Sequence, residues 1–190
     1  MPLFINPFRF VWDMIQLPKE ALDFTLSLEG GWYPGDEARD RHPTMKGVTQ
    51  GRYDMYRDDS GEPRQSVRLI SRPELESIYS EYWVEAYGPH LPRLTAITMF
   101  DHAVNSGAED AIRCFQHALG LTADGIVGPK TTKAIRSVGV DDRRVAELVT
   151  WERLTEYYDL ALKSQRLRPN LTSWVGRIVR FRERYLLPET

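Results

Sequence analysis

Cysteine is almost absent from this 190-residue chain, which contains only Cys114. One cysteine excludes an internal disulfide, so packing alone must hold the fold, as suits synthesis in a reducing cytoplasm. Neither Cys114 nor the four histidines have the short spacing of a metal site, and the sequence has no glycine-rich phosphate loop. The sequence therefore predicts no cofactor and no bound metal.

Long apolar runs are missing as well. No stretch approaches the length that spans a bilayer, so we expect no stable membrane insertion. The apolar N-terminus is interrupted by Pro7, Arg9 and Asp13, and it lacks the basic start and clean apolar run of a signal peptide. We therefore interpret residues 1–17 as an appended arm, and we expect the protein to stay in the cytoplasm in which it is made until something else releases it.

Charge of one sign is not in excess, because 25 lysines and arginines face 27 acidic residues. The net charge of -2 provides no general attraction for nucleic acid, and we expect none to bind. Basic residues do gather near the C-terminus, so the last helix is expected to be cationic. Two interpretations stay open, a solvated helix face and a surface that docks on an anionic polymer. The basic residues are Lys163, Arg166, Arg168, Arg177, Arg180, Arg182 and Arg184.

Helical periodicity is what the chain has in abundance. Residues 18–29 carry apolar side chains at the i, i+3, i+4, i+7 spacing of one buried helix face. Ser71 and Glu74 form a capping-box pattern that opens a further helix, and Gly107 is the expected turn of a helical hairpin. Asn170 is the predicted cap of the last helix. Helices are expected over residues 18–29, 72–83, 94–106, 108–119, 130–138, 141–164 and 170–186, so the predicted fold class is mainly α.

Glu29 ends the first predicted helix and is followed by Gly30 and Gly31. We expect these glycines to adopt the left-handed conformation that terminates helices, and to leave open space beside the carboxyl group. Cleavage of a glycosidic bond near neutral pH requires a carboxylic acid that still holds its proton, and usually a second carboxylate or an activated water. A helix C-terminus disfavours negative charge, so it favours the protonated carboxyl group that a catalytic acid requires. Position alone also allows Glu29 to be an ordinary solvated residue.

Candidate partners for Glu29 lie in the polar stretch that follows, which is expected to be a loop or a short β-hairpin. Asp36 and Asp40 could supply the second carboxylate, while the hydroxyls of Thr44 and Thr49 could hold a water or the backbone. Each of these residues, taken alone, is explained as well by solvation or local hydrogen bonding.

Five short segments, in order along the chain, carry a resemblance to a known family. Residues 28–33 read Leu-Glu-Gly-Gly-Trp-Tyr and residues 44–49 read Thr-Met-Lys-Gly-Val-Thr. Together they resemble the Glu-Gly-Gly opening and Lys-Gly-Ile-Thr close of the glycoside hydrolase family 108 muramidases. The Ile-Tyr and Tyr-Trp pairs within 78–83 and the segment Phe-Asp-His-Ala-Val-Asn-Ser-Gly at 100–107 are similar to further family segments. Residues 115–131 resemble the peptidoglycan-binding-like second half of the family.

This resemblance implies a lysozyme-like helical fold and a peptidoglycan hydrolase that cleaves the β-1,4 bond between N-acetylmuramic acid and N-acetylglucosamine. Glu29 matches the catalytic acid of the family motif. The chain would then comprise a catalytic lobe at 18–92 and a helical peptidoglycan-binding-like lobe at 93–190, packed as one compact unit. Phage endolysins of this kind depend on a holin for release, so the resemblance also implies a holin-type partner. We further expect a monomer.

The second carboxylate does not carry over cleanly from the family. Its members typically have an aspartate followed by Pro-Gly-Gly in the loop, whereas Asp40 is followed here by Arg-His-Pro. Asp36 and Asp40 are therefore both candidates, and Asp40 is favoured because it lies nearer to Thr44.

Four further residues are candidates for substrate binding. Trp32 and Tyr33 could stack on sugar faces. Asp101 and Asn105, one helical turn apart, could line the sugar groove, although interhelical hydrogen bonding would explain them equally well. Two rival functions stay open, a non-catalytic wall-binding or virion structural protein and a lytic transglycosylase with a single acid/base residue.

Overall fold

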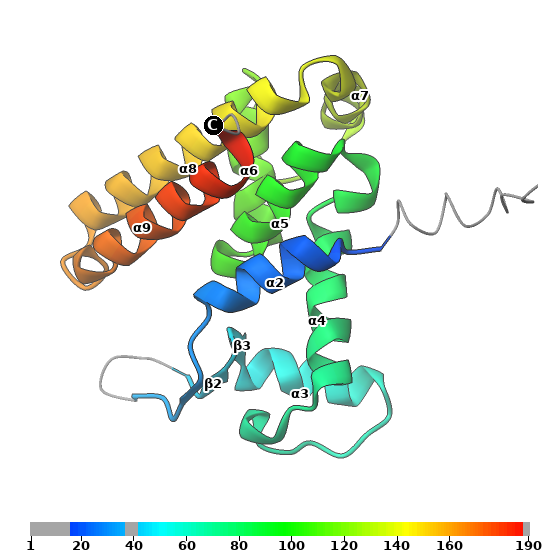
Figure 1. Cartoon of the computed structure of the whole chain (residues 1–190), viewed down its shortest axis with the longest axis vertical. Coiled ribbons are helices and arrows are strands. Elements are labelled where there is room, and N and C mark those ends of the chain that lie inside the picture. The colour runs from blue at the N-terminus through cyan, green and yellow to red at the C-terminus, as the bar shows by residue number, and fades with distance from the viewer. Residues whose placement is uncertain (1–15, 37–41, 188–190) are drawn as a thin grey trace, which may run out of the picture. The chain divides into compact units, whose positions relative to one another are not determined.

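The computed structural model describes residues 16–36 and 42–187 (Figure 1). Contacts within the chain divide these residues into two compact units, one formed by Gln16–Tyr82 and one that begins at Trp83. Helices dominate both units, and the strands are confined to one small sheet. The predicted mainly α fold class is therefore confirmed. Of the loop and the short β-hairpin that stayed open after the first helix, the structure has antiparallel strands. The predicted arm at 1–17 falls almost entirely outside the described residues.

The first unit begins with a helix that the sequence pattern anticipated. Helix α2 (Lys19–Leu28) buries Ala21, Leu22 and Thr25 along one face. It is followed by three strands and two further helices joined by a 3-10 turn. These elements are β1 (Trp32–Tyr33), β2 (Thr44–Met45), β3 (Val48–Thr49), α3 (Gln50–Asp59), η2 (Val67–Leu69) and α4 (Arg72–Glu85), the last of which runs into the second unit.

The three strands form an antiparallel sheet in the order β1-β2-β3. Tyr33 lies opposite Thr44 in the first pair of strands, and Thr44 lies opposite Thr49 in the second. Only two residues, Lys46 and Gly47, connect β2 to β3, and their φ angles are 51° and 79°. Two consecutive positive φ angles are the requirement of a tight type I′ hairpin, whose twist matches that of the strands.

Side-chain hydrogen bonds cap the N-termini of two helices in this unit. The backbone N–H and the hydroxyl of Ser71 both donate to Glu74 Oε2, at 2.8 and 2.7 Å, so the predicted capping box is confirmed. Helix α3 was not predicted, because its sequence is strongly polar and only Tyr53 is buried. Its first turn is capped by Thr49, whose hydroxyl oxygen accepts a hydrogen bond from the Arg52 backbone N–H at 3.3 Å.

The second unit is a helical assembly in which α5, α6 and α8 pack against one another and α9 packs on α8 (Figure 1). Gly107, with φ 97°, is the turn between α5 and α6, as the sequence predicts. Met99, Phe115 and Val149 come from these three helices and are buried in one apolar cluster. The elements are η3 (Gly88–His90), α5 (Arg93–Ser106), α6 (Ala108–Ala118), α7 (Pro129–Ser137), η4 (Val138–Val140), α8 (Asp142–Lys163), η5 (Arg168–Asn170), α9 (Leu171–Phe181) and η6 (Arg182–Leu186).

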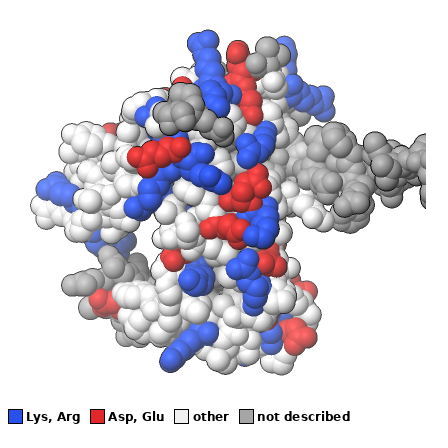
Figure 2. All heavy atoms as spheres, in the orientation of Figure 1, with Lys and Arg blue, Asp and Glu red and all other residues white. Residues whose placement is uncertain are grey.

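Two expectations about the C-terminal helices are wrong. Asn170 stands at the N-cap of α9, but its side chain makes no capping hydrogen bond, because a 3-10 turn leads directly into the helix. Arg177 is not on a solvated cationic face, since its guanidinium is buried and pairs with Asp101 at 2.8 Å. On the face shown in Figure 2, acidic and basic side chains are interspersed. Among the described residues, no helix has the length and apolar character that crossing a membrane requires.

Candidate active site

A surface hollow in the first unit, with a volume of about 370 Å³, lies where α2 meets the small sheet. Its walls combine one carboxyl group, hydroxyl groups and bare glycine backbone, which leaves both room and polar contacts for a sugar. The lining residues are Glu29, Gly30, Gly31, Tyr33, His42, Thr44 and Gly47.

Glu29 is placed at the hollow by the end of α2. It is the C-cap residue, and its backbone is extended with φ -83° and ψ 139°. The helix therefore ends at Leu28 because Glu29 itself leaves the helical conformation. The side chain is half-buried, so the carboxyl group is partly sheltered from water while it lines an open hollow.

The expected conformation of Gly30 and Gly31 is wrong, since neither is among the glycines with positive φ. The open space that we expected is confirmed, because a Cβ added to either glycine would meet no heavy atom within 4 Å. The two residues leave the approach to Glu29 clear of side chains. The two glycines therefore contribute open space beside the carboxyl group, not an unusual backbone conformation.

The β2–β3 turn closes the other side of the carboxyl group. A Cβ at Gly47 would lie 2.8 Å from Glu29 Oε2 and 2.8 Å from the Tyr79 hydroxyl oxygen. Contacts that short do not occur with real side chains, so only glycine lets the turn approach the carboxyl group this closely. The Tyr79 hydroxyl donates to the backbone carbonyl of Lys46 at 2.7 Å, which holds the turn on α4.

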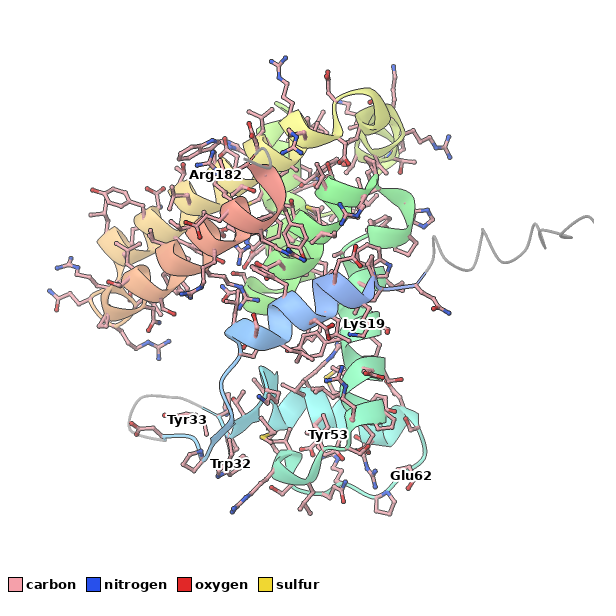
Figure 3. All side chains as sticks on the ribbon, viewed as in Figure 1. Lys19, Trp32, Tyr33, Tyr53, Glu62 and Arg182 are labelled. Atoms are coloured by element: carbon pink, nitrogen blue, oxygen red, sulfur yellow. The ribbon has the colours of Figure 1, made fainter. Side chains whose placement is uncertain are left out.

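The sheet brings two of the predicted residues to the hollow and leaves two others outside its lining. Tyr33 and Thr44 face each other across β1 and β2, and both line it. The Thr44 hydroxyl donates to the His42 carbonyl at 3.0 Å. Thr49 caps α3, and Trp32 lies under the Arg68 guanidinium with its ring centroid 5.8 Å from Cζ. Figure 3 shows Trp32 and Tyr33 as neighbours on β1.

The two candidate second carboxylates differ in what the structure says of them. Asp36 follows β1 and is half-buried, but it is not among the residues that line the hollow. Asp40 lies outside the described residues. The choice between them stays a prediction.

Asp101 and Asn105 both form hydrogen bonds between helices, which is the second of the two interpretations that the sequence left open. Asp101 is 0% exposed, and its carboxylate accepts hydrogen bonds from Arg153 Nη1 at 2.7 Å and Arg177 Nη2 at 2.8 Å. Burial alone would raise the pKa of Asp101, but the two guanidinium groups hold it well below its usual range. Asn105 donates to the Tyr157 hydroxyl at 2.7 Å. Asp101 thus binds three helices together, and its burial leaves no surface for a sugar.

Sequence reasoning missed three residues around Glu29, which are His42, Gly47 and Tyr79. The Lys-Gly pair between two short β-prone segments was a usable signal for a tight hairpin turn, and hence for Gly47. No local signal could show that Tyr79, on a helix 33 residues after Lys46, would hold that turn.

Comparisons with known proteins agree with this geometry. Residues 22–107 match the family model described as "Glycosyl hydrolase 108", and residues 110–179 match the one described as "Predicted Peptidoglycan domain". Among solved structures, that of SagA from Brucella abortus is similar, with 26% sequence identity and a TM-score of 0.70. The match covers 88% of this chain and 92% of that chain. No curated protein matches the sequence.

The fold and the matched domains define a lysozyme-type glycoside hydrolase. More specifically, the protein is a peptidoglycan hydrolase with a glycosyl hydrolase 108 domain followed by a peptidoglycan domain, as the sequence resemblance predicts. The predicted lobe boundary between residues 92 and 93 stays a prediction.

Proposed function

We propose that Glu29 is the general acid with which this peptidoglycan hydrolase cleaves the β-1,4 bond between N-acetylmuramic acid and N-acetylglucosamine. The observation that carries the proposal is the position of its carboxyl group, which lines a hollow of about 370 Å³ beside two glycines with no neighbouring side chain. A sugar oxygen can approach a carboxyl group in that setting, and protonation of the leaving oxygen is the step that glycoside hydrolysis requires.

Tyr33 and Thr44 are proposed substrate contacts, since both line the same hollow as Glu29. A tyrosine ring offers an apolar face with a polar edge, which suits a sugar ring, and a threonine hydroxyl can hydrogen-bond to a sugar hydroxyl. We also propose that the second carboxylate, which would steady the oxocarbenium-like transition state or orient water, comes from Asp40 or Asp36.

The test is mass spectrometry of the muropeptides released from purified wall sacculi by wild-type protein and by Glu29→Gln. We expect wild type to release products with reducing-end muramic acid, and we expect Glu29→Gln to release none. Glu62→Gln is the matched control, because it makes the same chemical change at an exposed carboxylate that does not line the hollow. It should behave as wild type does.

Two outcomes would contradict the proposal. Anhydro-muramic products would identify a lytic transglycosylase, and unchanged activity in Glu29→Gln would remove this residue from the chemistry. Substituting each of Asp36 and Asp40 by asparagine then locates the partner, since loss of reducing-end products is expected only for the residue that serves as second carboxylate.

We further propose that the protein acts as a bacteriolytic endolysin that relies on a holin-type partner to reach the wall, as the family resemblance implies. Expression with and without a membrane-permeabilising holin provides the test, because lysis is expected only in its presence. Sedimentation equilibrium tests the expected monomer.

A further inference from the structure

Three side chains of metal-ligand type converge in the second unit, whereas Glu29 belongs to the first. His102 comes from α5, Cys114 from α6 and Glu156 from α8. Cys114 Sγ lies 3.2 Å from Glu156 Oε2, and His102 Nε2 lies 3.4 Å from the same oxygen. One potential ligand atom from each residue lies within 4.8 Å of the other two.

His102 is the member of this group that calls for an explanation. Its side chain is fully buried, and within the part of the chain that the structure describes Nδ1 has no hydrogen-bond partner and Nε2 has only the long 3.4 Å contact with Glu156. Buried polar atoms are nearly always satisfied, because an unsatisfied one loses its hydrogen bonds to water without replacement. The edge-to-face contact with the Tyr157 ring provides no acceptor or donor for the ring nitrogens.

A route from solvent exists beside the same group. A hollow of about 380 Å³ between α6 and α8 is lined by Cys114 and Glu156, together with polar residues that include His117 and Glu152. Water or an ion in that hollow would meet the thiol and the carboxylate first, with the imidazole buried behind them.

We propose that His102, Cys114 and Glu156 bind a zinc ion, with water from the hollow as the fourth ligand. Histidine nitrogen, cysteine sulfur and carboxylate oxygen are the ligands that zinc takes in proteins, at about 2.0–2.3 Å in tetrahedral geometry. That geometry separates neighbouring ligand atoms by about 3.3–3.6 Å. The 3.2 and 3.4 Å separations already match it. The remaining pair, His102 and Cys114, lies within 4.8 Å and would close further as the side chains rotate toward the metal.

The charges also suit a divalent cation. A thiolate and a carboxylate together neutralise zinc, and the thiol selects against magnesium and calcium, which prefer oxygen ligands. A neutral imidazole has a ring nitrogen lone pair available for a metal. Zinc would displace the proton of Cys114 and would tie together α5, α6 and α8, which form the core of the second unit.

The decisive measurement uses the full, untagged chain after treatment with a chelator. Cobalt(II) is added as a spectroscopic probe of the zinc site, and zinc binding is measured by titration calorimetry. We expect one ion per chain, a near-ultraviolet absorption band from thiolate bonded to cobalt, and visible bands of tetrahedral coordination. Zinc should abolish these bands when it replaces cobalt.

Variants locate the site. Cys114→Ser and His102→Gln should each weaken zinc binding by at least about tenfold, since even the loss of an indirect partner of a ligand costs that much. His117→Gln is the matched control, because His117 lines the same hollow but pairs with Glu152 at 2.6 Å and is not one of the three converging residues. Its zinc affinity should equal that of wild type.

Two results would overturn the proposal. The first is a wild-type cobalt spectrum without the thiolate band, which requires no variant to fold. The second is zinc affinity that is unchanged in Cys114→Ser. Neither measurement depends on cleavage of peptidoglycan, so the outcome is separate from that of the Glu29 proposal.

Discussion

The close approach of the β2–β3 turn to Glu29 makes Gly47→Ala a sharp test of how the carboxyl group is held. The added Cβ would lie 2.8 Å from Glu29 Oε2, about 0.6 Å inside the 3.4 Å at which ordinary contact begins. The same atom would lie 2.8 Å from the Tyr79 hydroxyl oxygen. One of the two side chains, or the turn, must move.

Two effects of Gly47→Ala can be estimated separately. The φ of 79° lies in the left-handed region, where a side chain costs about 1–2 kcal/mol, and the clash adds to that cost. We therefore expect the free energy of unfolding to fall by about 1–3 kcal/mol. A displacement of Glu29, the proposed general acid, by several tenths of an ångström should lower kcat/KM by about tenfold to a hundredfold.

Gly51→Ala is the matched control. Its Cβ would meet no heavy atom within 4 Å, its φ is not positive, and it lies in the first turn of α3. Alanine is the better helix former by about 1 kcal/mol, so stability should be equal or slightly higher. Initial rates of muropeptide release from sacculi, measured well below the unfolding temperature of either variant, provide kcat/KM.

The reasoning fails if Gly47→Ala is folded and its kcat/KM stays within about threefold of wild type, a loss of less than about 0.7 kcal/mol. Glu29 would then not depend on the turn for its position. Loss of activity in Gly51→Ala would equally contradict it, since a change away from the hollow would have the same effect.

Three further predictions concern buried or half-buried polar groups. Asp101→Asn leaves the buried Arg153 and Arg177 without a counter-charge, so urea unfolding should show a loss of about 3–5 kcal/mol. Burial alone would raise the pKa of Glu74, but hydrogen bonds to its carboxylate outweigh that effect and lower the pKa to about 2. Because this folded-state pKa lies below the value in the unfolded chain, the ionised Glu74 stabilises the fold above about pH 4.5. That contribution, about 1–2 kcal/mol after solvent screening, should disappear from unfolding curves as pH falls toward 2, and Glu74→Gln should lack this pH dependence. Gln116→Ala removes the bonds that its amide makes to the loop after α6, which should cost about 2–3 kcal/mol by the same unfolding assay.

Each of these predictions has its own contradicting result. Asp58→Asn disrupts an exposed ion pair with Arg64, and its unfolding midpoint should hardly change. A loss for Asp101→Asn no greater than for Asp58→Asn would mean that the buried pairs are not coupled to folding. A Glu74→Gln profile parallel to wild type would assign the acid sensitivity to other groups, and a stable Gln116→Ala would mean that water replaces the amide.

Much of the fold follows from short-range patterns in the sequence. The helix pattern at 18–29, the capping box at Ser71 and the hairpin turn at Gly107 all depend on residues within a few positions of one another. Propensity and capping act at that range, so one sequence suffices to recognise them. Helix α3 escaped prediction because it has almost no apolar stripe, and its place depends on tertiary contacts of the buried Tyr53.

The candidate active site also combines features that are local in the sequence with features that form only on folding. Glu29 and its two glycines are adjacent in sequence, so the motif alone pointed to an acid with open space beside it. The approach of Gly47 and the support from Tyr79 depend on a turn and a helix that meet only after folding. Local periodicity carries no information about such a meeting.

The sequence by itself determined the mainly α class, most helix positions and the candidate acid, because these reflect local backbone preferences. Tertiary structure decided which charged residues lie inside. The sequence left Asp101 open between a sugar-groove residue and an interhelical hydrogen-bonding one, and it placed Arg177 on a cationic helix. The two residues are 76 positions apart, yet they form a buried pair. A charge is stable in the interior only when its partner and hydrogen bonds arrive together, and only the packed helices bring them together.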